Sequence, residues 1–96
     1  IYVTGYTSGL ENYIGLDGNT SFGSKDIFLV KYDSSGTKKW TKQFGTSSSD
    51  EGTGVTTDSS GNIYVTGKTS GNLDANTSSG GEDIFLVKFN SDGVKQ

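Results

Sequence analysis

Two short segments of the chain carry side chains that could bind a ligand: LDGNTS at residues 16–21 and LDANTS at residues 73–78. In each segment Asp, Asn and Ser alternate, and hard oxygen ligands at such a spacing can hold Ca²⁺. A calcium loop usually has more carboxylates than the two that each loop offers, so we favour Asx turns that cap the loop backbone and expect no metal. The candidate ligands are Asp17, Asn19, Asp74 and Asn76.

The same segments contain two acceptor tripeptides for N-glycosylation, which begin at Asn19 and Asn76. Such tripeptides are frequent by chance in a chain rich in Asn, Ser and Thr. Modification also requires a host with the glycosylation machinery, so both asparagines are candidate sites and nothing more.

Paired carboxylates stand at Asp50 and Glu51, directly before an expected strand. A glycosidase-like role would need a partner carboxylate, a cleft and an adjusted pKa. We therefore interpret the pair as a charged loop that opposes edge pairing or accepts hydrogen bonds from backbone amides.

The composition excludes several classes of protein. The 96 residues have a net charge of −3, with scattered Lys and no Arg, so no basic patch for nucleic acid exists. The absence of His and Cys removes the usual general base, the usual nucleophilic thiol and the common metal ligands. No apolar stretch approaches the roughly 20 residues needed to span a bilayer. We expect a protein that is not an enzyme, has no cofactor and does not cross a membrane.

An internal repeat organises the chain. Residues 16–39 align with residues 73–96 at an offset of 57, and fifteen of the 24 positions are identical. IYVTG at residues 1–5 recurs at residues 63–67, an offset of 62, because LENYIG at residues 10–15 is longer in the first copy by five residues. The chain therefore holds about one and two-thirds units.

Each unit divides into pieces of strand length. The apolar runs are short, rich in Ile, Val, Tyr and Phe, and bounded by Gly, Asp, Asn and Ser, which is typical of strands. The segments DSSG and NSDG predict tight turns, in which Asp or Asn caps the backbone and Gly takes a positive φ. DIFLVKY at residues 26–32 is apolar on both sides, which predicts a strand buried on both faces, whereas KWTKQF at residues 39–44 is half polar and suits an outer strand.

These patterns predict an all-β fold of four-stranded antiparallel β-propeller blades, with strands A to D joined as a meander. Residues 1–45 supply strands B, C and D of a first blade; residues 46–96 supply strands A, B and C of a second blade and the start of its strand D. Since 29% of the residues are hydrophobic and 15 are Gly, we expect an isolated monomer to be marginal. We therefore interpret the chain as a piece of a larger protein or a subunit of an oligomer.

The repeat also carries a family resemblance. DSSGNIYVTG at residues 58–67, the SSSDEGTGV segment ahead of it, and DIFLVKFNSDG at residues 83–93 resemble the bacterial and archaeal SBBP β-propeller repeat. This resemblance implies a β-propeller in a secreted or cell-surface prokaryotic protein and supplies no catalytic residues. DSSGTKKW at residues 33–40 is also similar to the Asp-box of sialidase-type propellers, but two residues rather than one separate Asp from Gly. We interpret it as a hairpin turn followed by a core Trp.

Three functions remain open. We favour a non-enzymatic scaffold whose partners are further copies of the repeat or of the chain itself, with a protein or glycan possible at the loop face. Tyr13 and Ile14 in the insert are the candidate contact residues, because recognition favours loops on a rigid scaffold; packing onto a neighbouring blade is the alternative. The rivals are a self-assembling filament or cross-β fibre, favoured by the absence of Pro and the low net charge, and a carbohydrate-binding module that uses Tyr13 or Trp40.

Overall fold

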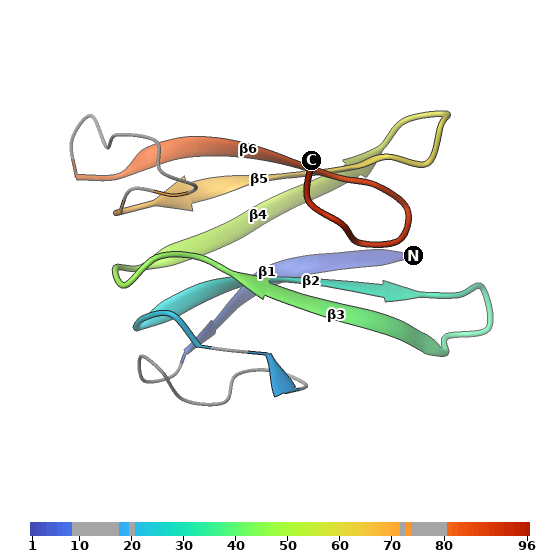
Figure 1. The fold of residues 1–96 in the computed structure, drawn as a ribbon, viewed down its shortest axis with the longest axis horizontal. Helices are drawn as coiled ribbons and strands as arrows, with labels where there is room; N and C mark the ends of the chain where they lie inside the picture. The colour runs from blue at the N-terminus through green and yellow to red at the C-terminus, as the bar shows by residue number, and fades with distance from the viewer. Residues whose placement is uncertain (9–17, 20, 72, 74–80) are drawn as a thin grey trace.

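The computed structural model of the chain is an all-β molecule of two stacked sheets (Figure 1). It describes residues 1–8, 18–19, 21–71, 73 and 81–96. Sheet 1 and sheet 2 each have three antiparallel strands in chain order, so each is a meander as expected. The strands of sheet 1 are β1 (Tyr2–Ser8), β2 (Lys25–Tyr32) and β3 (Lys38–Phe44); those of sheet 2 are β4 (Asp50–Thr57), β5 (Ile63–Thr69) and β6 (Asp83–Phe89).

Three tight turns form as their sequences predict. Asp33 Oδ1 accepts hydrogen bonds from the backbone N–H of Ser35 and of Thr37, both at 2.9 Å. Asp58 and Asn90 cap their turns in the same way. The last residue of each turn is a glycine in the left-handed region: Gly36 (φ 83°), Gly61 (φ 83°) and Gly93 (φ 81°).

The first prediction concerns the glycine of the β2–β3 turn. Gly36→Ala should lower the free energy of unfolding by about 1 kcal/mol, because an L side chain is strained at this φ. A Cβ would meet no atom within 4 Å at Gly36, so the cost is conformational rather than steric. Gly81 is equally open and has no positive φ, so Gly81→Ala is the matched control. Urea unfolding, followed by the fluorescence of the single Trp, measures the free energy of unfolding of both variants. Equal losses in the two variants would contradict the role of the positive φ at Gly36.

The core lies between the two sheets. β4 lies against β1 and β2, so the sheets stack face to face, as Figure 1 shows. The Phe44 ring in sheet 1 contacts two rings of sheet 2, with centroid distances of 6.4 Å to Phe85 and 5.4 Å to Phe89. The buried cluster comprises Ile27, Leu29, Phe44, Ile63, Val65, Leu73, Phe85, Val87 and Phe89.

The structure confirms some sequence predictions and differs from others. β2 is buried on both faces, through Ile27 and Leu29 on one side and Val30 on the other. In β3, which the half-polar KWTKQF sequence assigned to an outer strand, Gln43 faces away from Phe44 and is nevertheless buried. Its amide donates to Asp26 Oδ2 at 3.0 Å, which accounts for the burial. An unexpected register shift separates Gly52 from Gly54 in β4, where Thr53 is the extra residue of a bulge.

Each sheet has three strands, so the fourth strand of each expected blade remains a prediction. The last residues of the chain do begin to pair with β6. Lys95 forms a bridge with Phe89, and the backbone N–H of Gln96 donates to the carbonyl oxygen of Lys88 at 2.8 Å. Within the described ranges, no helix has the length and apolar character that crossing a bilayer requires.

Candidate functional site

Most candidate site residues from the sequence lie outside the described part of the chain. These are Tyr13, Ile14, Asp17, Asp74 and Asn76, whose roles therefore stay predictions. Asn19 is described and half-buried; its amide donates to the carbonyl oxygen of Thr41 at 3.2 Å and so ties this segment to β3. Trp40 is half-buried and its ring lies 6.2 Å from that of Tyr2.

The sequence predicted a charged loop at Asp50 and Glu51, but both residues lie in β4, and Asp50 is wholly buried together with Asp26. Asp50, at the start of β4, accepts hydrogen bonds from the Thr46 backbone N–H at 2.7 Å, from the Thr46 hydroxyl and from the Thr69 hydroxyl. It thereby joins the loop before β4 to the end of β5. Its role is the backbone-amide acceptor that the sequence suggested as one alternative.

Asp26, near the start of β2, holds the adjacent loop in a parallel way. Its Oδ2 accepts from the Phe22 backbone N–H at 2.5 Å and from the Gln43 amide at 3.0 Å. Its Oδ1 is buried and accepts no hydrogen bond from the described residues. A Cβ on Gly45 would lie 2.9 Å from this oxygen and 2.7 Å from Asp50 Oδ2, so the two carboxylates face a common point.

This carboxylate pair lacks the further ligands of a metal site. Among the described residues, no three His, Cys, Asp or Glu side chains gather where they could hold a metal ion. A calcium ion takes six to eight oxygen ligands, and most oxygens of the pair already accept hydrogen bonds from loop and strand groups. We therefore interpret the pair as the anchor of the two loops at this end of the sheets.

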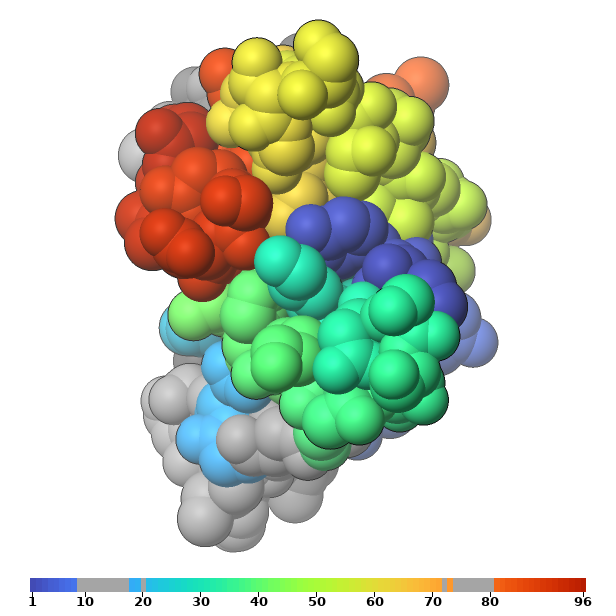
Figure 2. All heavy atoms as spheres, turned by 90° about the vertical axis from the view of Figure 1, so that its right-hand side faces the viewer, coloured from blue at the N-terminus to red at the C-terminus, as the bar shows by residue number. Residues whose placement is uncertain are grey.

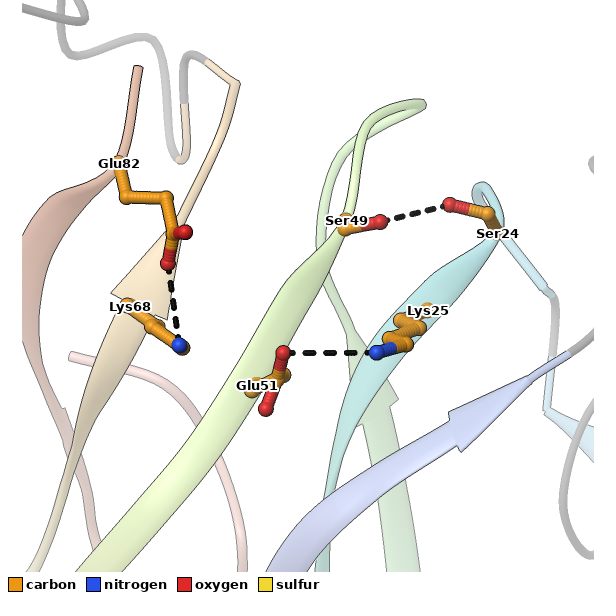
Figure 3. Close-up of polar contacts among 6 residues, drawn as sticks. All are labelled: Ser24, Lys25, Ser49, Glu51, Lys68 and Glu82. Carbon is orange, nitrogen blue, oxygen red and sulfur yellow. Dashed lines mark hydrogen bonds and ion pairs between the residues drawn. The ribbon is translucent and has the colours of Figure 1, made fainter. Parts of the chain in front are cut away.

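A row of alternating charges crosses the same end of the molecule (Figure 3). Lys25 Nζ in sheet 1 lies 3.6 Å from Glu51 Oε2 in sheet 2, and the Ser24 and Ser49 hydroxyls bond beside them at 2.8 Å. Glu51 is also the register partner of Lys68, whose Nζ lies 3.2 Å from Glu82 Oε2. The hydrogen bond to Glu82, with the charges of Glu82 and Glu51, raises the pKa of Lys68. The row links the two sheets, although partly exposed pairs of this kind contribute little stability.

Each sheet has two distinct apolar faces, which recur in the repeat. The Leu face carries Ile27 and Leu29 in sheet 1 and Ile84 and Leu86 in sheet 2. The Val face carries Ile1 and Val3 in sheet 1 and Ile63 and Val65 in sheet 2. Inside the molecule, the Leu face of sheet 1 is stacked on the Val face of sheet 2 in one buried cluster.

The outward faces of both sheets carry exposed apolar side chains, although Val30 on the outward face of sheet 1 is buried. On the Leu face, Ile27 and Leu29 are 0% exposed, whereas their repeat counterparts Ile84 and Leu86 are 88% and 70% exposed. Because the motif is the same in both strands, the difference arises from the neighbouring sheet that covers one and not the other. Sequence periodicity alone does not reveal it.

The repeat itself is recognised by comparison with known proteins. Residues 39–74 match the model of a family described as SBBP, beta-propeller repeat. The chain contains an SBBP-type β-propeller repeat. This match confirms the resemblance predicted from the sequence. It begins in β3 and continues through β4 and β5 to residue 74.

A second comparison finds similarity between this chain and a short part of a longer protein. The chain is 34% identical over 79 residues to the regulatory protein FlaEY of Caulobacter vibrioides. The alignment covers 79% of this chain and 8% of FlaEY, so the chain spans a small part of that relative.

The turns after β2 and β4 lie together at the end of the molecule opposite the buried carboxylates (Figure 1). Figure 2 views this end, where the β2–β3 and β4–β5 turns, the N-terminal residues and the C-terminal segment lie together. In the β4–β5 turn, Asp58 Oδ2 accepts from the Asn62 amide and from the Tyr64 hydroxyl, both at 3.0 Å. The hydrogen bonds from Asn62, with those from Tyr64 and the Ser60 backbone, hold the pKa of Asp58 below its ordinary value of 3.8.

This lowered pKa predicts an acid-sensitive turn. Since the pKa of Asp58 is lower in the folded chain, its stabilisation is present above the ordinary value of 3.8 and is lost as the pH falls through the folded value. Asp58→Asn should therefore flatten the fall of unfolding free energy on the acid side, and Tyr64→Phe should do so partly. Urea titrations at a series of acidic pH values measure this slope; an unchanged slope in Asp58→Asn would contradict the role.

Proposed function

We propose that this chain is a non-enzymatic segment of a β-propeller that serves as a structural and interaction scaffold in a secreted or cell-surface prokaryotic protein. The observation that carries the proposal is the uncovered Leu face of sheet 2, whose counterpart in sheet 1 is wholly buried against the next sheet of the repeat. The SBBP match and the lack of His and Cys support it.

The proposed blade has four strands, and the sheet edges support this count. In sheet 1, β3 pairs with the edge of β2 that does not face β1. In sheet 2, the corresponding edge of β6 pairs only with Lys95 and Gln96, which would begin a further strand. In sheet 2, β4 pairs with β5; in sheet 1 the corresponding edge of β1 pairs with no described strand. A further copy of the repeat on each side would supply both missing strands.

A hollow on sheet 2 marks where the next copy would lie. It has a volume of about 270 Å³ and its lining includes Tyr64, Thr66 and Leu86. The counterpart of Thr66 in sheet 1 is Thr4, and there β4 approaches so closely that a Cβ on Gly52 would lie within 3.0 Å of Thr4 and Ile27 side-chain atoms. The strand that follows β4 by one repeat would occupy the hollow in the same way.

FlaEY is named as a regulatory protein, and the matched segment has the size of a module within it. A scaffold segment that organises repeats or presents loops to a partner is compatible with that name. The exposed apolar residues on the two outward faces also favour one rival, a self-assembling β-rich filament, because exposed apolar residues and open strand edges promote association.

An extended chain tests the proposal. Residues 40–96 are appended directly after Gln96, which corresponds to Lys39 in the repeat, so that the repeat continues without a break. We expect the backbone amides of β6 that do not bond to β5 to exchange with deuterium about tenfold or more slowly than in the 96-residue chain, because a fourth strand pairs with them. Unchanged exchange in β6 would contradict the propeller proposal.

A further inference from the structure

The two sheets have the same local structure on their Leu faces. The Thr4 hydroxyl donates to the Phe28 carbonyl oxygen at 2.8 Å, and the Thr66 hydroxyl donates to that of Phe85 at 2.9 Å. Lys31 Nζ lies 5.8 Å from the Tyr2 ring centre, and the corresponding distance from Lys88 to Tyr64 is 5.9 Å. The uncovered Leu face of sheet 2 thus already has the form that the covered face has in sheet 1.

The Val faces of the two sheets differ in the exposure of their apolar side chains. Ile63 and Val65 of sheet 2 are 0% exposed because sheet 1 covers them, whereas Ile1 and Val3 of sheet 1 are 68% and 43% exposed. The molecule therefore presents an uncovered Leu face on one side and, on the other, a Val face that is exposed at Ile1 and Val3 but buried at Val30. These are the same two kinds of face that pack together in its interior.

From this, and resting on the repeat structure of the proposed function, we propose that the Leu face of sheet 2 binds the Val face of sheet 1 in a second copy of this chain. Ile84 and Leu86 of one copy cover Ile1 and Val3 of the next. The contact joins different surfaces of the two copies, so it is heterologous, and each added copy leaves one Leu face and one Val face free. Copies consequently associate head-to-tail.

The charged side chains on the Leu face of sheet 2 include those of Lys68 and Lys88. On the Leu face of sheet 2, the side chain of Lys68 is paired with Glu82 at 3.2 Å within the same sheet. The pair brings no net charge to the interface, and the apolar residues Ile84 and Leu86 lie beside it on β6. Burial of the exposed apolar side chains of both faces supplies the driving force.

Two single variants and their mixture test the proposal on the 96-residue chain. Leu86→Lys removes the Leu face, and Val3→Lys removes the Val face; both positions are exposed, so the folded monomer should survive, as circular dichroism can verify. Sedimentation velocity should show that the mass of the unmodified chain grows with concentration beyond a dimer. Each variant alone should be monomeric, with association weakened about tenfold or more.

A mixture of the two variants distinguishes a head-to-tail contact from a symmetric contact. Leu86→Lys retains a Val face and Val3→Lys retains a Leu face, so the two should form a one-to-one dimer that grows no further. Ser59→Lys, in the exposed β4–β5 turn, is the matched control and should associate like the unmodified chain. A dimer of either variant alone would indicate a symmetric contact and overturn the proposal.

A monomeric unmodified chain, or a mixture that stays monomeric, would also overturn it. These outcomes leave the propeller proposal intact, because the exchange of β6 amides in the extended chain depends on contacts within one chain. Slow exchange there with no association here would show that the faces bind only when linked.

Discussion

Leu29→Ala is expected to lower the free energy of unfolding by about 2–5 kcal/mol, whereas Leu86→Ala is expected to change it by less than about 0.5 kcal/mol. Both residues occupy the same position of the repeated DIFLVK motif. Leu29 is wholly buried between the sheets and Leu86 is largely exposed, so only the first substitution leaves a cavity. The difference between the two losses measures how much the neighbouring sheet contributes to the free energy of unfolding.

Urea unfolding of the two variants measures this difference, with Trp40 fluorescence as the signal. A low protein concentration keeps the Leu face of sheet 2 uncovered by another copy. Ile27→Ala and Ile84→Ala form a second matched pair with the same expectation, since their burial differs in the same way. Similar costs at the two positions would contradict the stacking of sheet 1 on sheet 2.

Asp50→Ala should lower the free energy of unfolding by about 2–4 kcal/mol. The substitution removes the acceptor for the backbone N–H and hydroxyl of Thr46 and for the buried hydroxyl of Thr69. These donors have no water to replace the carboxylate, which is why the loss exceeds that of an exposed hydrogen bond. The loop before β4 should loosen with the end of β5.

Two control variants, one at an exposed carboxylate and one at a buried carboxylate, test whether the loss of stability is specific to Asp50. Asp92→Ala changes an exposed carboxylate in the turn after β6 and should have little effect. Asp26→Asn is expected to cost less than Asp50→Ala, because Asn keeps an acceptor oxygen for Phe22 and Gln43. If Asp50→Ala and Asp92→Ala destabilise the chain equally, the anchoring role of Asp50 is wrong.

Local patterns were sufficient to predict the strands and turns. Short apolar runs bounded by turn residues located β2 and β6, and the Asp-Ser-Ser-Gly segments located turns whose capping bonds and positive φ the structure shows. These features depend on residues close in sequence, so periodicity and turn chemistry reveal them. The bulge at Thr53 was missed, although glycines on both sides of it were a usable signal.

Features set by long-range packing could not be predicted in this way. The burial of Asp26 and Asp50 together depends on the approach of the starts of β2 and β4, and no local motif encodes it. Gln43 looked like an outward polar residue because its partner, Asp26, lies on another strand. Likewise, Ile84 and Ile27 are identical in sequence context and differ only in what covers them. The residues at Tyr13, Asp17 and Asn76 remain sequence predictions.

The most direct test of the account is the cost of Leu86→Ala in two chains. In the 96-residue chain the substitution should be nearly neutral. In the extended chain, where a further copy of the repeat would cover sheet 2, the same substitution should lower the free energy of unfolding by about 2 kcal/mol or more, as Leu29→Ala does in the shorter chain. An equal, small cost in both chains would show that no repeat stacks on this face and would contradict the account.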